Sequence, residues 1–466
     1  MSASLFWFRR DLRLTDNPGL NAAAGSGGPV YAVFCLDELE KVNARQRAFA
    51  IGSLRALRTV LDKRDATLTL VRGSPSEALA HAAQRLDATA VYCSRSYSRS
   101  ERAVESEAVA ALRRSDIALH MSKGDVVHEP EAVAELKQSE GEGYRVFPPF
   151  FAAWQSLDVA VPSGEVIPNG RDEHAGALPE DDTAPPVPAG EAAARSALER
   201  FVTARAADYI VSGQYPATDG TSGLAPYLRF GCVSPRVVHQ AMARRMAWSW
   251  TLAQERRSMA AFMRQLALRD FFIQLAYFVP ALHDEALQEK MRSFPWSTGQ
   301  ETLESWRKGR TGYPFVDAAM RQLSTQGLVH QRAAICAASF SCFDLGLDWR
   351  MGRDVWMDEY LAADEALCDG NWQWLAGVGS DQAAYPRIYN PEKQARQFDA
   401  QAVYLRRWVP ELRKLPTAAA LAPWRMDRQH QIELSFFTPD QYPQPIVDHE
   451  LAAREFLKRY RAFREA

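Results

Sequence analysis

The sequence predicts an α/β fold in two parts, an N-terminal parallel α/β domain and a larger all-α C-terminal domain. Short apolar segments alternate with helix-forming segments over roughly residues 1–130, which is typical of a parallel sheet covered by helices. From residue 191 onward helical spacing dominates and strand signals nearly disappear. A chain of 466 residues is also too long for a single core. We therefore expect domains at 1–130 and 191–466, joined by a linker at 131–190.

Five segments have the apolar, β-prone character of buried strands. In chain order they are Ser4–Phe8, Pro29–Cys35, Leu68–Val71, Ala90–Tyr92 and Ile117–Leu119. Between them lie segments with helical spacing, such as Arg45–Leu61 and Glu101–Leu112. The alternation predicts a Rossmann-like sheet, but no Gly-x-Gly-x-x-Gly follows the first strand, so the dinucleotide fingerprint is absent there. Arg9 and Arg10, directly after that strand, are either ion-paired or part of a site.

The second half begins after a stretch that has no periodicity. Residues 161–190 are rich in Pro, Gly, Asp and Glu, which indicates an extended surface linker. Helical spacing then predicts helices at Ala192–Arg205, Pro235–Met246, Ala260–Tyr277, Phe315–Gln326, His330–Leu345 and Glu450–Phe463.

Composition excludes several classes of protein. The net charge is only -2, so a nucleic-acid site requires a local basic patch. The six cysteines form no Cys-x-x-Cys and no Cys/His ligand spacing, which argues against a zinc site, a disulfide framework or an iron–sulfur cluster; no metal is expected. The N-terminus lacks a signal segment, and no apolar run reaches about 18 residues. We expect a cytoplasmic protein without a membrane anchor.

Residues 364–391 hold the densest group of chemically active side chains. In order these are Asp364, Cys368, the turn signal Asp369-Gly370, Trp372 and Trp374. Most tryptophans of water-soluble chains are core residues, so the pair does not define a site by itself.

This run resembles the flavin-facing segment of the photolyase/cryptochrome family, in which Gly-(Gly/Asn)-Trp-Gln-Trp precedes Arg-Ile-(Phe/Tyr)-Asn-Pro. Further matches, in the family's order, are WFRRDLR at 7–13, DGTS at 219–222, PYLRFG at 226–231, TGYP at 311–314 and VDAAMRQL at 316–323. The sequence is most similar to bacterial class I cyclobutane pyrimidine dimer photolyases. The resemblance implies FAD in the helical domain. It also raises a second, light-harvesting chromophore of folate or deazaflavin type in the α/β domain, whose presence and identity the sequence leaves open.

The family's flavin-binding positions fall on Tyr209, Thr221, Ser222, Gly223, Leu224, Ala225, Gln265, Arg269, Asp364 and Cys368. Read alone, the run 219–224 is a turn into a helix, whose N–H groups and hydroxyls suit a phosphate. The resemblance makes it the cradle of the FAD pyrophosphate, with Ala225 in place of the usual serine. Cys368 holds the position opposite flavin N5, where most photolyases have asparagine and insect cryptochromes have cysteine. The alternative is that Cys368 is only a small buried residue.

Three tryptophans match the family's electron-transfer chain: Trp296, Trp349 and Trp372. An excited flavin can oxidise an indole, and a row of indoles carries the hole to the surface. This implies that the flavin can be photoreduced. Three core tryptophans are the alternative.

The lesion-binding and DNA-binding positions of the family fall on Gln265, Leu268, Arg269, Gln331, Arg332, Trp374 and Gln394. Trp374 keeps one stacking wall for a flipped-out pyrimidine dimer. Gln265 replaces a glutamate, so it can form hydrogen bonds but supplies neither a charge nor a proton. Leu268 replaces a tryptophan and cannot stack, and Gln331 replaces an asparagine.

Other positions depart from the family as well. Ile335 stands for a methionine of the lesion pocket, and Gly213 for an arginine that contacts DNA phosphate. Ala334 and Ala362 replace an Arg–Asp pair beside the isoalloxazine. Both partners are missing together, which avoids leaving one buried charge unpaired.

We consider three functions. The first is light-driven repair, in which reduced FAD passes an electron to a pyrimidine dimer in UV-damaged DNA and recovers it after the ring splits. The second is a cryptochrome-like blue-light photoreceptor with FAD and the tryptophan chain but weak or no repair. The third, a non-photochemical flavoprotein oxidoreductase, conflicts with the absent dinucleotide fingerprint and the intact tryptophans. We favour repair by a monomeric enzyme whose lesion preference is weakened or altered.

Overall fold

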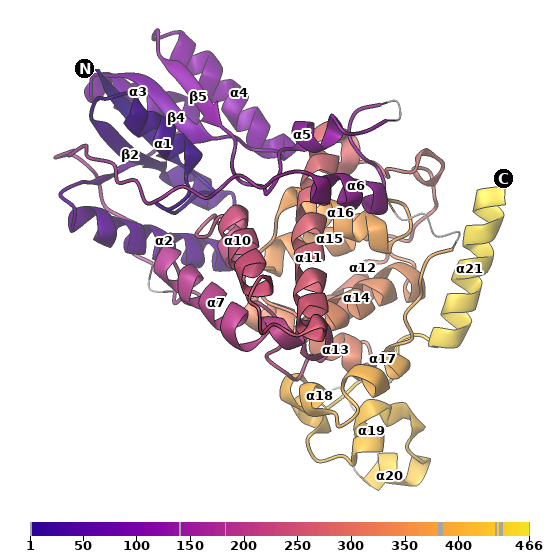
Figure 1. The fold of residues 1–466 in the computed structure, drawn as a ribbon. Helices are drawn as coiled ribbons and strands as arrows, with labels where there is room; N and C mark the ends of the chain where they lie inside the picture. Colours follow the sequence, from indigo (N-terminus) through magenta and orange to yellow (C-terminus); the bar gives the residue numbers. More distant parts are fainter. Residues whose placement is uncertain are drawn as a thin grey trace. The chain divides into compact units, whose positions relative to one another are not determined.

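The computed structural model describes residues 2–138, 141–181, 183–380, 385–433, 436–437 and 441–465. The chain divides into two compact units. Figure 1 traces the chain from the N-terminus in indigo to the C-terminus in yellow and labels its helices and strands. Unit 1 comprises Met1–Asp208 and Thr221–Pro280, and unit 2 comprises Tyr209–Gly220 and Ala281–Ala466. The predicted domain boundaries at 130 and 190 follow the sequence pattern and stay a prediction.

A five-stranded sheet lies at the centre of unit 1, in the order β3-β2-β1-β4-β5. All four neighbouring pairs are parallel. The strands are β1 (Ala3–Phe8), β2 (Val30–Cys35), β3 (Leu68–Val71), β4 (Ala88–Ser94) and β5 (Ala118–Ser122). The predicted parallel sheet and its five strands are therefore confirmed.

Helices cover both faces of this sheet because β1 is apolar on both sides. The helices are α1 (Pro18–Gly25), α2 (Ala44–Asp62), α3 (Pro75–Arg85) and α4 (Arg99–Arg113). Leu5 and Trp7 pack in one core cluster with residues of α3 and α4. Phe6 points to the other face, where a Cβ on Gly19 of α1 would lie 2.9 Å from its ring. Such a run of buried apolar residues is typical of a central parallel strand.

The charged motif after β1 holds the end of the strand in place. The Arg9 guanidinium is buried between Glu105, 2.6 Å away, and Glu38, 3.3 Å away, and its Cζ lies 4.5 Å from the centroid of the Trp7 ring. Asp11 accepts hydrogen bonds from the Arg9 amide and from the Ser94 hydroxyl. A buried charge requires such partners. Of the two alternatives for Arg9, the structure shows the ion pair.

The segment 131–190 contains two helices before it becomes extended. They are α5 (Pro130–Ala134), which begins at the boundary, and α6 (Phe147–Ser156). The extended part is fixed to the sheet, since the Asp172 carboxylate accepts from Thr69 and pairs with Arg85 at 2.6 Å. Unit 1 continues with α7 (Glu191–Ala204), η2 (Ala206–Asp208), α9 (Ala225–Arg229), α10 (Pro235–Met246) and α11 (Ala253–Phe278).

Unit 2 is helical in its described part. Its α-helices are α8 (Tyr209–Ser212), α12 (Gln300–Arg307), α13 (Pro314–Gln326), α14 (Gln331–Ser339), α15 (Trp349–Glu359), α16 (Glu365–Leu375), α17 (Pro391–Phe398), α18 (Val403–Trp408), α19 (Thr417–Leu421), α20 (Arg428–Glu433) and α21 (His449–Glu465). This confirms the predicted helical half. The predicted single helix His330–Leu345 differs, because α14 ends at Ser339 and a π-helical turn, η5 (Phe340–Asp344), continues it. An apolar pattern does not distinguish the two hydrogen-bond registers.

Within the described residues, no helix combines the length and the apolar character needed to cross a lipid bilayer. None of the six cysteines forms a disulfide within the chain, and all six are buried. Burial accordingly raises the pKa of several of their thiols, among them Cys336 and Cys35.

A buried carboxylate connects the two family-like runs at 311–314 and 316–323. Asp317 accepts hydrogen bonds from the Thr311 amide and hydroxyl, both at 2.7 Å, and from the Gly312 amide at 3.1 Å. The Tyr442 hydroxyl also donates to it. Gly312 has a φ of 82°, and a Cβ there would lie 2.4 Å from the Pro445 nitrogen. The two runs therefore fix the start of α13.

We expect Asp317→Ala to lower the free energy of unfolding by about 3 kcal/mol or more, because it leaves several buried donors without an acceptor. Asp317→Asn keeps one carboxamide oxygen and should lose less. Urea unfolding followed by circular dichroism measures both. Asp358→Ala, at an exposed position of α15, is the control. Equal midpoints for Asp317→Ala and the control would contradict the role of this carboxylate.

Candidate functional site

Helix α16 of unit 2 carries the predicted flavin-facing acid, thiol and tryptophan along one side. Asp364 caps the helix by accepting from the Leu367 amide at 3.0 Å. Cys368 and Trp372 follow at intervals of four residues, which places them on the same face. All three side chains are buried, with exposed fractions of 2%, 6% and 4%. The structure therefore brings these three predicted residues together.

The predicted turn at Asp369-Gly370 is wrong. Both residues lie within α16 and are buried. Glycine weakens a helix by about 1 kcal/mol relative to alanine, but tertiary packing regularly overrides so small a preference. The helix is held here by Asp369, whose carboxylate bonds to residues of two other segments.

Trp372 packs against two tryptophans that sequence reasoning did not select. Its ring centroid lies 5.4 Å from that of Trp356 and 6.3 Å from that of Trp306, and both pairs are edge-to-face. The space for its ring comes from Gly352 in α15, where a Cβ would lie 2.3 Å from the indole Cη2. Gly352 thus lets α15 and α16 approach closely.

One sequence signal could have found this cluster. Trp349, Gly352 and Trp356 stand at positions i, i+3 and i+7 of α15, which is the spacing of one helix face. Two indoles separated by a glycine on one face indicate a groove that a large ring can enter.

The other two predicted electron-chain residues also lie in unit 2. Trp349 is fully buried, and the guanidinium carbons of Arg350 and Arg353 lie 4.7 and 5.3 Å from its ring centroid. Trp296 is half-buried and contacts the rings of Phe294 and Phe456. The series from Trp372 and Trp349 to Trp296 runs from buried to partly exposed side chains. An electron-transfer role for the series remains a prediction.

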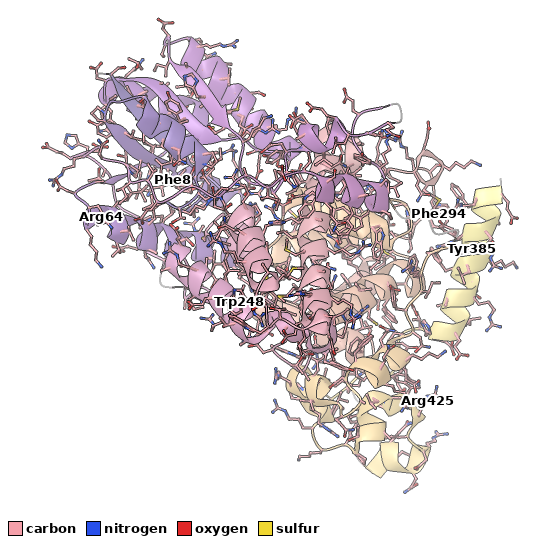
Figure 2. All side chains as sticks on the ribbon, in the orientation of Figure 1. Phe8, Arg64, Trp248, Phe294, Tyr385 and Arg425 are labelled. Atoms are coloured by element: carbon pink, nitrogen blue, oxygen red, sulfur yellow. The ribbon has the colours of Figure 1, made fainter. Side chains whose placement is uncertain are left out.

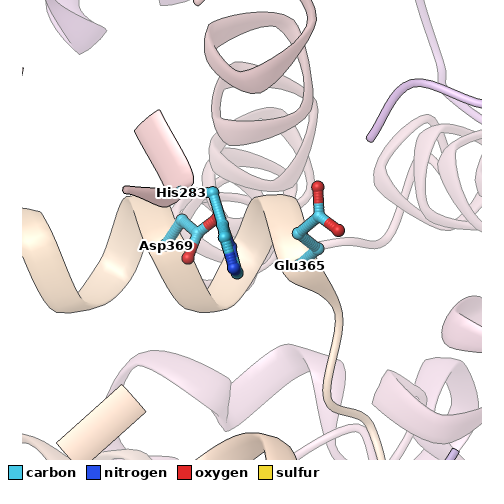
Figure 3. A group of neighbouring side chains, drawn as sticks. All are labelled: His283, Glu365 and Asp369. Atoms are coloured by element: carbon cyan, nitrogen blue, oxygen red, sulfur yellow. The ribbon is translucent and has the colours of Figure 1, made fainter. Parts of the chain in front are cut away.

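A charged network lies on the side of α16 that bears Asp369. The Asp369 carboxylate contacts His283 Nδ1 at 3.1 Å and Arg353 Nη1 at 3.0 Å. Glu365 lies one turn earlier on α16. One carboxylate oxygen of Glu365, one of Asp369 and one ring nitrogen of His283 lie within 4.8 Å of one another (Figure 3). The hydrogen bond with Asp369 raises the pKa of His283. Because Arg353 already contacts the carboxylate, we interpret the group as an ion-pair network that joins α15, α16 and the His283 segment.

In unit 1, the backbone at 221–225 turns into α9, where the sequence predicts that an anion binds. Gly223 has a left-handed φ of 65°, and Leu224 is right-handed with φ -84° and ψ -10°. Alternating handedness points successive N–H groups into one concavity, which suits a phosphate. The Ser222 hydroxyl accepts from the Leu224 amide at 3.3 Å, and a Cβ on Gly223 would meet nothing within 4 Å. Backbone donors in this arrangement suit a phosphate. Binding of the FAD pyrophosphate between Thr221 and Ala225 stays a prediction.

Three further predicted residues lie on α11 of unit 1. Gln265 and Leu268 are half-buried. Arg269 is buried, and its guanidinium donates to the Asp125 carbonyl at 2.8 Å and lies 3.6 Å from Asp270. Burial raises the pKa of Asp270 to about 6. Arg269 is therefore engaged within unit 1, and its predicted contact with cofactor or DNA stays a prediction.

The remaining residues predicted to face the lesion come from α14 of unit 2 and from two helices that each pack on it, α16 and α17. They are Gln331 and Arg332 on α14, Trp374 on α16 and Gln394 on α17. Gln331 is exposed and the other three are half-buried. Arg332 donates from Nε to the side-chain oxygen of Gln214 at 2.7 Å, and its Cζ lies 5.0 Å from the Phe398 ring centroid.

The substituted positions fit an uncharged local structure. A Cβ on Gly213 would lie 2.5 Å from the Tyr209 carbonyl oxygen, so the chain leaves no room there for the family's arginine. The Gly213 carbonyl instead lies 3.1 Å from His330 Nε2, and burial lowers the pKa of that histidine to about 4. Tyr209 is half-buried in α8. Ala362 is buried and Ala334 half-buried.

A small cleft in unit 1 lies at the carboxyl ends of β1 and β4. Its walls include Arg10, Arg95 and Tyr97. Open parallel sheets bind ligands at this kind of position. Here Arg10 pairs with Glu101 at 2.7 Å and Arg95 with Glu131 at 2.6 Å, so charged side chains already contact one another there. A second chromophore in this unit remains a prediction.

Comparison with known proteins identifies both halves of the chain. Residues 4–167 match the model of the DNA photolyase domain, and residues 262–462 match the FAD-binding domain of DNA photolyase. The chain is 32% identical to a deoxyribodipyrimidine photo-lyase of Synechococcus. The alignment covers 99% of this chain and 97% of that protein.

Two solved structures are similar throughout. A class III photolyase of Agrobacterium tumefaciens has a TM-score of 0.88 at 30% identity, covering all of this chain and 98% of that one. A cryptochrome of Synechocystis has a TM-score of 0.87 at 27% identity, covering 98% of each chain. The similarity therefore extends to proteins named for repair and to a cryptochrome.

We expect Gly352→Ala to displace the Trp372 ring and to lower the free energy of unfolding by about 2 kcal/mol, as overpacking of a core does. The near-ultraviolet circular dichroism of the indole cluster should change with it. Gly25→Ala, at the last residue of α1 where a Cβ would meet nothing within 4 Å, should not lower the free energy of unfolding and should leave the spectrum unchanged. A Gly352→Ala protein with wild-type stability and spectrum would contradict the close contact.

Proposed function

The chain belongs to the DNA photolyase family, and from this premise we propose that it is an FAD-dependent, blue-light-driven DNA photolyase, a carbon–carbon lyase that splits pyrimidine dimers in DNA. The observation that carries the proposal is the match of residues 262–462 to the FAD-binding domain of DNA photolyase. That range includes the packed helices α14, α16 and α17 and all three tryptophans of the predicted electron chain.

The family's flavin-binding positions indicate which residues would hold FAD. The N–H groups at 221–225 of unit 1 would bind the pyrophosphate. In unit 2, Asp364, Cys368 and Tyr209 stand at the family's flavin-binding positions. When bound, FAD supplies the absorption of blue light and the electron for the dimer. Cys368 would offer a thiol, a weaker donor and acceptor than the amide of asparagine, opposite flavin N5.

The lesion would be held mainly by stacking and neutral hydrogen bonds. Trp374 provides one aromatic face for a base taken out of the duplex. Gln265 and Gln331 can each donate and accept through their amides, but neither carries a charge. Leu268 offers only apolar contact. We therefore expect a lower affinity for the dimer than in a pocket with a glutamate and two tryptophans.

Trp372, Trp349 and Trp296 would carry the hole to the surface during photoreduction. The change from buried to half-buried side chains along this series supports the direction. The guanidinium groups near Trp349 are paired, Arg350 with Asp348 and Arg353 with Asp369, so they add little net positive charge beside its ring.

A second candidate is a cryptochrome-like photoreceptor with weak or no repair. The substitutions at Gln265, Leu268 and Ile335 favour it, and so does the similarity to the Synechocystis cryptochrome. The remaining parts of the proposal are common to both candidates. They are a monomeric state, a place in the cytoplasm and an optional second chromophore in the α/β domain.

Repair is tested by illuminating the reduced, FAD-loaded protein with an oligonucleotide that contains one thymine dimer. We expect restored thymines, measured by chromatography, at a rate that depends on blue light. The same mixture in darkness is the control. Bound FAD without any restored thymine would support the photoreceptor instead.

Replacing Trp372 with phenylalanine should strongly slow the light-driven loss of the oxidised flavin absorbance, since phenylalanine is much harder to oxidise than indole. Trp306→Phe makes the same exchange at a ring that touches Trp372 and should leave the rate nearly unchanged. Time-resolved absorbance measures both variants. If the two are slowed equally, packing rather than electron transfer explains the effect.

A further inference from the structure

An exposed aromatic patch lies between α10 and α11 of unit 1. Trp248 and Trp250 have exposed fractions of 41% and 70%, and Leu252 next to them has 66% (Trp248 is labelled in Figure 2). The two ring centroids are 5.2 Å apart, with an interplanar angle of 44°. Indoles rarely stay in contact with water unless they bind a partner, because each buries a large apolar area when it packs.

The loop that carries the rings has an ordered local structure. Arg256 donates to the carbonyls of Met246 and Trp248 at 3.0 and 3.1 Å. The Arg245 guanidinium carbon lies 4.7 Å from the Trp248 ring centroid, and its Nη1 donates to Thr251 at 2.6 Å. These bonds hold the rings at the surface, so a partner would meet a preformed platform.

The charge around the rings is positive. Residues 244–257 contain four arginines and a single acid, Glu255, in a chain whose total charge is -2. Glu255 pairs with Arg245 at 3.7 Å and caps α11 through the Leu252 amide. Arg244 and Arg257 are exposed, and neither forms an ion pair with another described residue. The patch therefore combines stacking surfaces with uncompensated positive charge.

We propose that this patch, Arg244–Arg257, binds single-stranded DNA, with Trp248 and Trp250 stacking on bases and Arg244 and Arg257 contacting phosphates. Aromatic rings next to cationic side chains are the pattern with which proteins bind unpaired strands without sequence preference. A paired duplex presents phosphates but keeps its bases stacked, so the rings favour an unpaired strand.

The inference goes beyond light-driven repair and does not require it. The patch lies between the two regions that match the family models, 4–167 and 262–462. It shares no residue with the predicted flavin-binding and lesion-binding positions. Binding to undamaged single strands in darkness is therefore independent of dimer splitting.

The test is fluorescence anisotropy of a labelled, undamaged 12-nucleotide single strand, titrated in darkness with the full-length FAD-loaded protein. We expect Trp248→Ala/Trp250→Ala to weaken binding about tenfold or more, because stacking contributes strongly per base. Trp248→Phe/Trp250→Phe should retain most of the affinity. Met121→Ala, at an apolar side chain of unit 1 that is 45% exposed, should bind like wild type.

The arginines are tested through salt. Arg244→Gln/Arg257→Gln should lower the slope of log affinity against log salt by about 1.4, since each phosphate contact on a single strand contributes about 0.7. Arg64→Gln/Arg171→Gln removes the same charge from exposed positions of unit 1 and should leave the slope unchanged (Arg64 is labelled in Figure 2).

Dimer repair in the same variants separates the two proposals. If the Trp248→Ala/Trp250→Ala protein loses single-strand binding but repairs dimers at the wild-type rate, the result supports the patch as a separate DNA-binding site. This comparison does not depend on how fast the wild-type protein repairs dimers. Unchanged binding in the Trp248→Ala/Trp250→Ala protein overturns the proposal. It is also overturned if the wild-type protein sediments as a dimer that this double variant converts to a monomer, since a second copy would then be the occupant.

Discussion

The contact between Gly352 and the ring of Trp372 is the constraint on which the rest of unit 2 depends. An added Cβ would stand 2.3 Å from the ring, well inside van der Waals distance, so α15 and α16 can adopt this separation only with glycine there. The position of Trp372 then fixes the face of α16 toward which Cys368 and Asp364 point. A helix that presents residues at i, i+4 and i+8 cannot move one of them alone.

On its other side, α16 is held against rotation about its axis by the ion pairs of Asp369. Asp369 is 2% exposed and accepts from both His283 and Arg353, each on a different segment of unit 2. A buried carboxylate is costly without such partners. Apolar close packing on one side and a paired carboxylate on the other thus determine the orientation of one helix, and that helix bears residues assigned to both flavin and lesion.

Much of the fold follows from local patterns, and the departures have physical causes. Alternating apolar and helical segments were sufficient for the parallel sheet, because a buried strand must be apolar on both faces. The turn predicted at Asp369-Gly370 failed because side-chain partners distant in sequence outweigh a local glycine preference. Likewise, no local signal reveals that Arg269 is engaged with Asp125, 144 residues away. Of the two tryptophans that pack on Trp372, Trp356 could have been inferred from the spacing in α15, whereas Trp306 lies on α12.

Three positions that carry charge in the family are neutral in this chain, whereas arginines surround the exposed rings of Trp248 and Trp250. The two features have different energetic consequences. At Gln265, Ala334 and Ala362, family positions that carry charge are neutral here, which avoids desolvating ions in a buried site. Such a pocket loses strong electrostatic contacts to the lesion but needs no compensating partner. Surface arginines pay little desolvation and act at a distance, so a group such as that around Trp248 attracts a polyanion even when the chain as a whole is nearly neutral. If both proposed sites bind DNA, a weaker contact with the lesion and an electrostatic contact at the patch would be complementary, since the affinity for a long strand would combine both.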